Sequence, residues 1–203
     1  MNSDAGSHRV FLCIALCLAL LGGAFLLDIP MRDWVNAHYS ERAEHLMRFI
    51  TKWGDAPSHL VAGSIALIFA LICKRRSWAL IFAAMLLACV IAGVANPTIK
   101  TLAGRSRPNV KVNVGWNGPS FEQRYQSFPS GHTLSSSAFF SALLLVRRRV
   151  GLFFVPIPMI IASARVGLNA HWISDVVFAA MLGFCCALLA RRILRIWFEV
   201  PNE

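Results

Sequence analysis

Long apolar runs constrain this chain more than any other feature of its sequence. Six runs stand out, at about residues 10–27, 58–73, 78–99, 131–146, 150–168 and 172–190. An α-helix needs about 20 apolar residues to cross a bilayer, and the shorter runs imply tilting or local thinning of the membrane. Charged residues make up only 15% of the chain, which argues against a soluble domain. The sequence therefore predicts an all-α polytopic membrane protein, with residues 1–203 forming one compact bundle of six transmembrane helices.

Basic residues predict how these helices are oriented. The chain has 20 Lys and Arg against 10 Asp and Glu, and they cluster at Lys74–Arg76, Arg147–Arg149 and Arg191–Arg195, at the ends of apolar runs. This distribution disfavours a nucleic-acid-binding face. With six spans the clusters share one side, which the positive-inside rule makes cytoplasmic. Both termini are then cytoplasmic, and the opposite face is the outer one, periplasmic in a bacterial inner membrane.

The N-terminal part of the chain predicts one retained helix and one surface segment. The run at 10–27 is longer than a usual signal-peptide core and lacks a clear small-x-small cleavage pattern before Asp28, so we interpret it as a membrane helix. Residues 28–55 follow on the outer side with nearly balanced charge and several aromatic residues. This pattern indicates a helix along the membrane surface, which covers the bundle or guides a lipid.

The cysteines do not indicate a disulfide or metal framework. All six lie within or at the edge of apolar runs, and no CxxC pair occurs among Cys13, Cys17, Cys73, Cys89, Cys185 and Cys186. Free thiols packed as small apolar groups are the expectation. Pairing of Cys185 or Cys186 between subunits is the less favoured alternative, and the sequence leaves the oligomeric state open.

One outer segment breaks the charge rule. Residues 100–130 carry five basic residues against the single acidic Glu122, namely Lys100, Arg105, Arg107, Lys111 and Arg124. An outward loop this basic needs a reason other than orientation, and binding of an anionic group supplies one.

Three polar blocks fall on this outer face, at 100–108, 129–132 and 164–175. The fourth and sixth spans both begin there, and helix N-termini offer free N–H groups that suit a phosphate. Gly131 permits close backbone approach to an anion, and Ser130 either caps the helix or donates to the same oxygen. Taken alone, this block is equally typical of simple helix capping.

Titratable groups complete the constellation. His171 and Asp175 are four residues apart and share a helix face if the sixth span has begun, so the carboxylate fixes the tautomer and leaves one ring nitrogen free to attack. A structural His–Asp pair at a helix end remains the alternative for these two. Three cations, Lys100, Arg107 and Arg165, come from separate segments and are either membrane-boundary residues or ligands of an oxyanion. His132 is then free to protonate a leaving oxygen.

The order and spacing of these residues resemble a known signature. Lys100-x6-Arg107-Pro108, then Pro129-Ser130-Gly131-His132, then Arg165-x5-His171-x3-Asp175 are similar to the three-part motif of the type 2 phosphatidic acid phosphatase family, which shares its site with vanadium-dependent haloperoxidases. The motifs cover residues 100–175, and the six-span layout extends the resemblance over most of the chain.

The resemblance implies a role for each motif residue. It implies that His171 is the nucleophile that forms a phosphohistidine, that Asp175 orients it, and that His132 is the general acid. It implies phosphate binding by Lys100, Arg107, Ser130, Gly131 and Arg165, without a metal or other cofactor. The family often has Ser immediately before the third-motif arginine, whereas this chain has Ala164, with Ser163 one position earlier. That departure puts one supporting contact in doubt.

Several functional alternatives stay open at this point. The preferred hypothesis is a phosphatase acting on phosphatidylglycerol phosphate, undecaprenyl pyrophosphate, phosphatidic acid or lipid A phosphate. A lipid phosphotransferase and a non-catalytic lipid-binding scaffold are alternatives, whereas a transporter is disfavoured because the span centres are nearly free of charge. Haloperoxidase activity is remote, because those enzymes are soluble. Residues 109–127 are expected either to select the substrate or merely to pack, with the head group facing Lys111, Trp116, Phe121, Arg124 and Tyr125.

Overall fold

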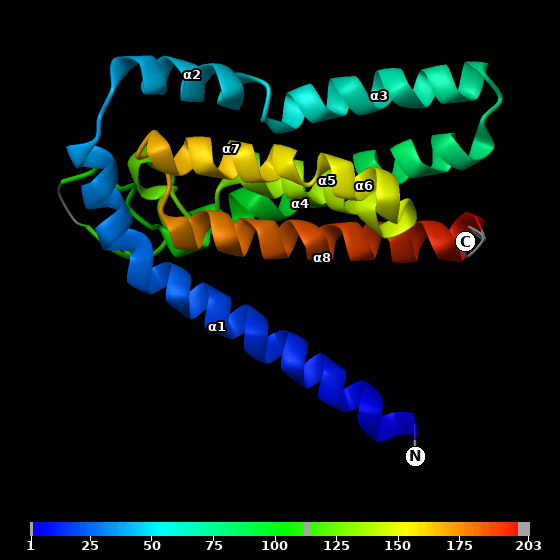
Figure 1. Cartoon of the computed structure of the whole chain (residues 1–203), viewed down its shortest axis with the longest axis horizontal. Coiled ribbons are helices and arrows are strands. Elements are labelled where there is room, and N and C mark those ends of the chain that lie inside the picture. Colours follow the sequence, from blue (N-terminus) through cyan, green and yellow to red (C-terminus); the bar gives the residue numbers. More distant parts are fainter. Residues whose placement is uncertain (1, 112–113, 199–203) are drawn as a thin grey trace.

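The chain folds into a bundle of helices joined by short turns and one long loop (Figure 1). The computed structural model describes residues 2–111 and 114–198. The helices are α1 (Asn2–Ala37), α2 (Glu41–Lys52), α3 (Ala56–Ile72), α4 (Arg76–Ala103), the 3-10 turn η1 (Gln123–Tyr125), α5 (Gly131–Val146), α6 (Arg148–Phe154), α7 (Pro156–Gly167) and α8 (Ile173–Phe198). Within these described ranges the β pairing is one isolated bridge between Arg105 and Trp116. The predicted all-α class is confirmed.

Several of these helices are long and apolar enough to cross a membrane. Within the described residues four segments meet this criterion, namely Val10–Ala37, Arg76–Ala103, Arg148–Gly167 and Ile173–Arg195. The bent pair α2 and α3, which meet at 47°, makes a fifth if it forms one span. Helix α5 is apolar but has only 16 residues. The prediction of a multi-spanning protein is therefore confirmed, while six complete spans remain a prediction.

Helices α4, α5 and α8 form the centre of the bundle, and small residues let them approach closely. Ala88, Ala138 and Ala187 are fully buried between them. A Cβ added to Gly183 of α8 would stand 2.8 Å from the backbone nitrogen of Ala138 in α5. Small residues are the usual means of close helix packing in membranes, where the hydrophobic effect between helices is weak.

Helix α1 diverges from the bundle at its N-terminal end and contacts α8 nearer its C-terminal end (Figure 1). Here the structure corrects an expectation, because Asp28 does not begin a separate surface segment. It lies inside α1, which continues to Ala37, and it is buried. The Asp28 carboxylate tolerates burial because it pairs with Arg105 and accepts hydrogen bonds from Ser174 inside the bundle. The rest of the expected surface segment contains α2, an amphipathic helix whose apolar residues Leu46 and Phe49 are exposed.

The six cysteines are free thiols, as predicted. Only Cys89 and Cys186 are buried, whereas Cys13, Cys17, Cys73 and Cys185 are exposed on the protein surface. The expectation that the thiols are packed inside was therefore wrong for these four, because their helices place them on outward faces.

The alternation of helix directions sets the position of the polar blocks. The C-terminal ends of α4 and α7 and the N-terminal ends of α5 and α8 meet at one end of the bundle (Figure 1). The basic clusters at the α3–α4 turn, at the α5–α6 junction and near the end of α8 lie at the other end. The three polar blocks therefore lie at the same end of the bundle, as the sequence predicted.

Candidate active site

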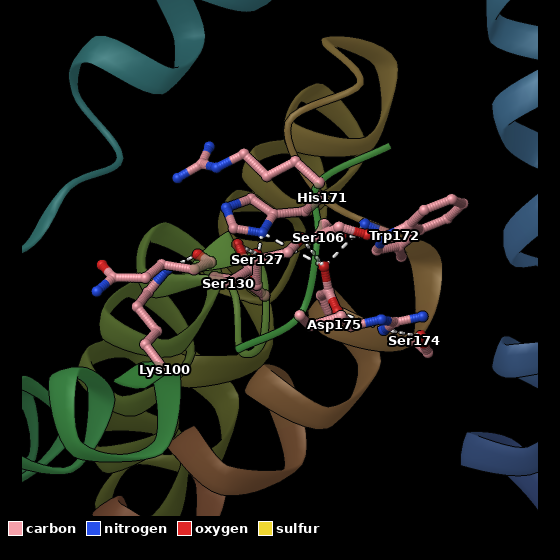
Figure 2. Close-up of polar contacts among 12 residues, drawn as sticks. Lys100, Ser106, Ser127, Ser130, His171, Trp172, Ser174 and Asp175 are labelled. Atoms are coloured by element: carbon pink, nitrogen blue, oxygen red, sulfur yellow. Dashed lines mark hydrogen bonds and ion pairs between the residues drawn. The ribbon is translucent and has the colours of Figure 1, made fainter. Parts of the chain in front are cut away.

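His171 lies in the turn between α7 and α8 and is 2% exposed (Figure 2). Its Nδ1 is 2.8 Å from the backbone carbonyl oxygen of Ser127. A carbonyl oxygen only accepts hydrogen bonds, so Nδ1 carries the proton and Nε2 keeps its lone pair. Figure 2 shows the second ring nitrogen turned away from Asp175. The fold thus selects the tautomer that a nucleophilic histidine requires.

Asp175, in the first turn of α8, is completely buried and strongly hydrogen-bonded. Its Oδ2 accepts from the Ser127 hydroxyl at 2.5 Å and from the Trp172 backbone N–H at 2.9 Å, and its Oδ1 pairs with Arg105 at 2.5 Å. Oδ2 is 3.5 Å from Nδ1 of His171, farther than the Ser127 carbonyl. Asp175 therefore faces the imidazole as expected, but the closest acceptor is a backbone oxygen that the sequence did not reveal.

The environment keeps His171 neutral. Burial lowers the pKa of His171 to about 4, and the nearby Lys100 and Arg165 act in the same direction, while Asp175 opposes them. A buried imidazole without enough compensating charge loses its proton more readily. His171 is thus a free base over the whole physiological range of pH.

The three predicted cations lie close to one another. Lys100, Arg107 and Arg165 are close enough for Arg107 and Arg165 each to act electrostatically on Lys100. The Lys100 ammonium donates to the Gln126 carbonyl at 2.7 Å and the Arg107 Nε to the Gln123 carbonyl at 3.0 Å. Across residues 2–111 and 114–198 no carboxylate forms an ion pair with any of the three, and the buried Arg165 Nε has no partner. Converging cations that form no contact ion pair with a carboxylate suit an anionic ligand.

The block at the start of α5 lies beside them. Ser130 is fully buried and its hydroxyl accepts from Thr133 Oγ1 at 3.1 Å. It makes no side-chain bond to the helix backbone, so the alternative in which Ser130 caps α5 is not the one observed. Half-buried Gly131 and His132 follow, and Lys100 and Arg165 act electrostatically on His132. His132 therefore lies within electrostatic range of the cations.

The loop residues expected to face a head group divide into two kinds. Lys111, Phe121 and Arg124 are exposed, and Phe121 is 87% exposed. Tyr125 is buried, which corrects the expectation for that residue, because the 3-10 turn η1 directs its side chain inward while Gln123 and Arg124 of the same turn stay exposed. Trp116 is exposed on one side and its ring centroid lies 4.9 Å from the Arg105 guanidinium. Tyr125 thus has a packing role, and so does the face of Trp116 that lies against Arg105.

The hydroxyl of Ser163 does not take the place of the serine that the family often has at the position of Ala164. Ala164 is buried, whereas Ser163 is exposed and its hydroxyl donates to the Met159 carbonyl within α7 at 2.9 Å. Successive helical residues point about 100° apart, so Ser163 cannot reach the space that Ala164 faces.

Sequence reasoning missed four residues of the site. Asp28 and Arg105 are buried and ion-paired at 2.6 Å, Ser127 contacts both His171 and Asp175, and Asn96 of α4 has a buried Oδ1 without a partner. Asn96 precedes Lys100 by one helical turn, and its amide nitrogen would lie 2.9 Å from a Cβ on Gly131. The one local signal was Arg105, counted in the basic loop without a role.

The site combines a buried neutral histidine, a buried carboxylate beside it, a second histidine and three cations that form no ion pair with a carboxylate among the described residues. This set is suited to transfer of a phosphoryl group through a phosphohistidine, with charge on the equatorial oxygens balanced by Lys100, Arg107 and Arg165. Among the described residues, no three His, Cys, Asp or Glu side chains gather as a metal-binding group.

A family model and two relatives of known activity match this chain. A family model described as the PAP2 superfamily matches residues 78–198. Lipid A 1-phosphatases of Rhizobium johnstonii and Rhizobium etli are 30% identical over 161 residues and 31% identical over 103 residues. These alignments cover 72% and 49% of this chain but only 66% and 44% of the relatives, less than two thirds of either.

Two crystal structures share the fold. Aquifex aeolicus LpxE aligns with a TM-score of 0.62 at 17% identity, covering 82% of this chain and 95% of the other. The transmembrane PAP2-type phosphatidylglycerolphosphate phosphatase of Bacillus subtilis aligns with a TM-score of 0.67 at 21% identity, covering 91% and 94%.

Proposed function

Because the chain belongs to the PAP2 superfamily, we propose that it is an integral membrane lipid phosphatase that works through a phosphohistidine on His171. The observation that carries this proposal is the hydrogen bond from His171 Nδ1 to the Ser127 carbonyl, which leaves Nε2 as the nucleophile within electrostatic range of Lys100 and Arg165. His132 is the general acid in this mechanism, and Ser130 and the Gly131 amide bind phosphate oxygens together with the cations.

Two displacements make up the reaction. Nε2 of His171 attacks phosphorus, the bond from phosphorus to the lipid oxygen breaks, and His132 gives its proton to that oxygen. Water then attacks the phosphohistidine, His132 takes the proton, and the phosphorus–nitrogen bond breaks to release phosphate and free His171. Each group returns to its starting state, so no metal is needed in this scheme.

The proposed topology has six spans, with α5 as a short tilted span. Both termini are cytoplasmic, and the active site opens at the periplasmic face of an inner membrane. One observation supports this orientation. The basic clusters lie at the end of the bundle away from the turn between α7 and α8 (Figure 1), the turn that contains His171, and cytoplasmic loops are generally enriched in Lys and Arg.

For the substrate, we propose the 1-phosphate of a lipid A-type glycolipid first and phosphatidylglycerol phosphate second. The names of the two Rhizobium relatives favour the first, and that of the Bacillus subtilis structure favours the second. Undecaprenyl pyrophosphate and phosphatidic acid carry the same phosphoryl group and belong in the same test.

The testing experiment measures phosphate release by detergent-purified protein from these four lipids in the presence of EDTA. The wild type, His171→Ala and the matched control His45→Ala are compared, since His45 is an exposed histidine of α2. We expect release by the wild type and by His45→Ala, and loss of release by at least about a thousandfold in His171→Ala.

Two results would contradict the proposal. Release that survives His171→Ala removes His171 as the nucleophile, and release abolished by EDTA removes the metal-free scheme. Release only in the presence of an acceptor lipid would indicate the phosphotransferase instead.

A further inference from the structure

The most unusual feature outside the proposed reaction is a buried chain of charges that links α1 to the active site. Arg105 is 6% exposed and lies between two carboxylates. Its Nη2 is 2.6 Å from Asp28 of α1, and its Nη1 is 2.5 Å from Asp175 of α8. The guanidinium also lies within 5.4 Å of the ring centroids of Phe25, Trp116 and Trp172. Packing and hydrogen bonds together leave Arg105 little freedom.

Asp28 extends this chain to the backbone of α8. Its Oδ1 accepts from the Ser174 backbone N–H at 2.9 Å, and its Oδ2 accepts from the Ser174 hydroxyl at 2.6 Å. Free N–H groups in the first turn of a helix are commonly satisfied by a nearby side-chain oxygen. Here that oxygen comes from a residue 146 positions away. Asp28 therefore holds in place the helical turn that carries Asp175.

We propose that Asp28 and Arg105 are positioning residues for catalysis, which makes α1 part of the catalytic machinery. This inference rests on the proposed function of His171. Arg105 binds Oδ1 of Asp175 and leaves Oδ2 facing His171 Nδ1 at 3.5 Å. Asp28 lies outside residues 78–198, the region matched by the family model.

Charge sharing explains why a second carboxylate is needed. With Asp28 present, Arg105 divides its charge between two partners, and Asp175 keeps enough negative charge to orient and stabilise the imidazole as it attacks. Without Asp28, Arg105 pairs with Asp175 alone. The negative charge of Asp175 is then more fully neutralised and stabilises the His171 imidazole less. Without Arg105, the full charge of Asp175 acts on His171. The other charges acting on the imidazole, Lys100 of α4 and Arg165 of α7, are unchanged in either case.

The experiment compares Asp28→Asn with Asp33→Asn, a matched control on the same helix whose carboxylate is exposed and pairs only with the adjacent Arg32 among the described residues. We expect kcat of Asp28→Asn to fall about tenfold or more. The analogy is with residues that hydrogen-bond to the ligands of a metal ion and thereby orient them. We expect KM to stay within about threefold, because Asp28 does not touch the phosphate site. A thermal unfolding curve in detergent shows whether each variant is folded.

A second arm separates a catalytic effect from a merely structural one. In Arg105→Gln, the acid limb of the kcat/KM profile should move to higher pH, because an unshared Asp175 charge favours the imidazolium. Arg105→Lys keeps the charge, so its limb should stay near that of the wild type. If Arg105→Gln does not fold, the kcat and KM of Asp28→Asn and Arg105→Lys decide the question.

Three outcomes overturn the inference. They are a folded Asp28→Asn with the kcat of Asp33→Asn, a rise in KM alone, and an acid limb that does not move in a folded Arg105→Gln. His171→Ala is assayed in parallel. Activity in that variant means that the proposed function fails, whereas loss in His171→Ala with an unaffected Asp28→Asn overturns only the role of Asp28 and Arg105.

Discussion

His171 donates its Nδ1 proton to the backbone carbonyl of Ser127 at 2.8 Å, across a sequence separation of 44 residues. The hydroxyl of the same serine donates to Asp175 at 2.5 Å. Ser127 therefore joins the histidine and the carboxylate through two different atoms. A backbone carbonyl cannot be removed by substitution, so the tautomer of His171 persists even when the Ser127 side chain is changed. This separation makes the contribution of the hydroxyl measurable by itself.

Ser127→Ala should lower kcat by about tenfold without abolishing activity. The variant removes one buried hydrogen bond to a carboxylate, a contribution of about 1.5–3 kcal/mol, but retains the carbonyl that fixes His171. Steady-state phosphate release provides the measurement. Ser163→Ala is the control, because the Ser163 hydroxyl bonds only within its own helix among the described contacts. Complete loss of activity in a folded Ser127→Ala would contradict this division of roles.

The acid limb of kcat/KM should lie near pH 4. Burial lowers the pKa of His171 to about 4, so the imidazole is neutral and nucleophilic above that value and is inactivated as pH falls through it. Activity of the free enzyme should therefore not decline on account of His171 between pH 7 and about pH 5. A limb with a midpoint near 6.5, the value of an ordinary histidine, would show that burial does not control this group.

Arg165→Ala should weaken inhibition by vanadate about tenfold or more. Vanadate mimics the transferred phosphoryl group, and a hydrogen bond to a charged group contributes about 1.5–3 kcal/mol. Arg124→Ala is the matched control, since Arg124 is exposed and already paired with Glu122 at 2.5 Å. The inhibition constants of the two variants are compared at constant ionic strength. Equal constants would remove Arg165 from the anion site.

Gly104→Ala should destabilise the protein by about 2 kcal/mol or more and reduce activity with it. Gly104 ends α4 with a φ of +54°, and an added Cβ would overlap the backbone carbonyl of Gly118. Arg105 and Arg107 follow within three residues, so a displaced loop moves both. Gly93→Ala on the same helix meets no atom within 4 Å and should leave the unfolding midpoint unchanged or raised. Equal midpoints for the two variants would contradict the tight approach at Gly104.

The proposed orientation predicts which positions react from outside an intact cell. Phe121→Cys should be labelled by a membrane-impermeant maleimide, because Phe121 is exposed on the loop beside the site. The native Cys73 lies in the α3–α4 turn, exposed at the other end of the bundle, and should react only after permeabilisation. Labelling in the reverse order would invert the topology.

The helices were largely predictable because their signal is local. Apolar runs and the basic residues that end them are read within about 20 positions, and five of the six expected runs correspond to helices, while the run at 150–168 is divided between α6 and α7. The motif residues were predictable for a related reason. Their spacing within each block and the order of the blocks resemble a family, and the alternation of helix directions brings the blocks to one end.

The long-range partners were not predictable. Arg105 contacts Asp28 and Asp175 across separations of 77 and 70 residues, and nothing in the local pattern links these positions. Asp28 at the end of an apolar run is indistinguishable from an ordinary boundary residue, and a backbone acceptor such as the Ser127 carbonyl has no sequence signature at all.

The sequence by itself determined which segments are helical and which three motifs contribute side chains to the candidate site. The tertiary structure alone decided which histidine nitrogen is free, which loop residues are exposed, and how the charge of Asp175 is balanced. The physical reason is that apolar periodicity is a property of neighbouring residues. A buried ion pair or a hydrogen bond to a carbonyl depends on desolvation and geometry that exist only after the helices pack.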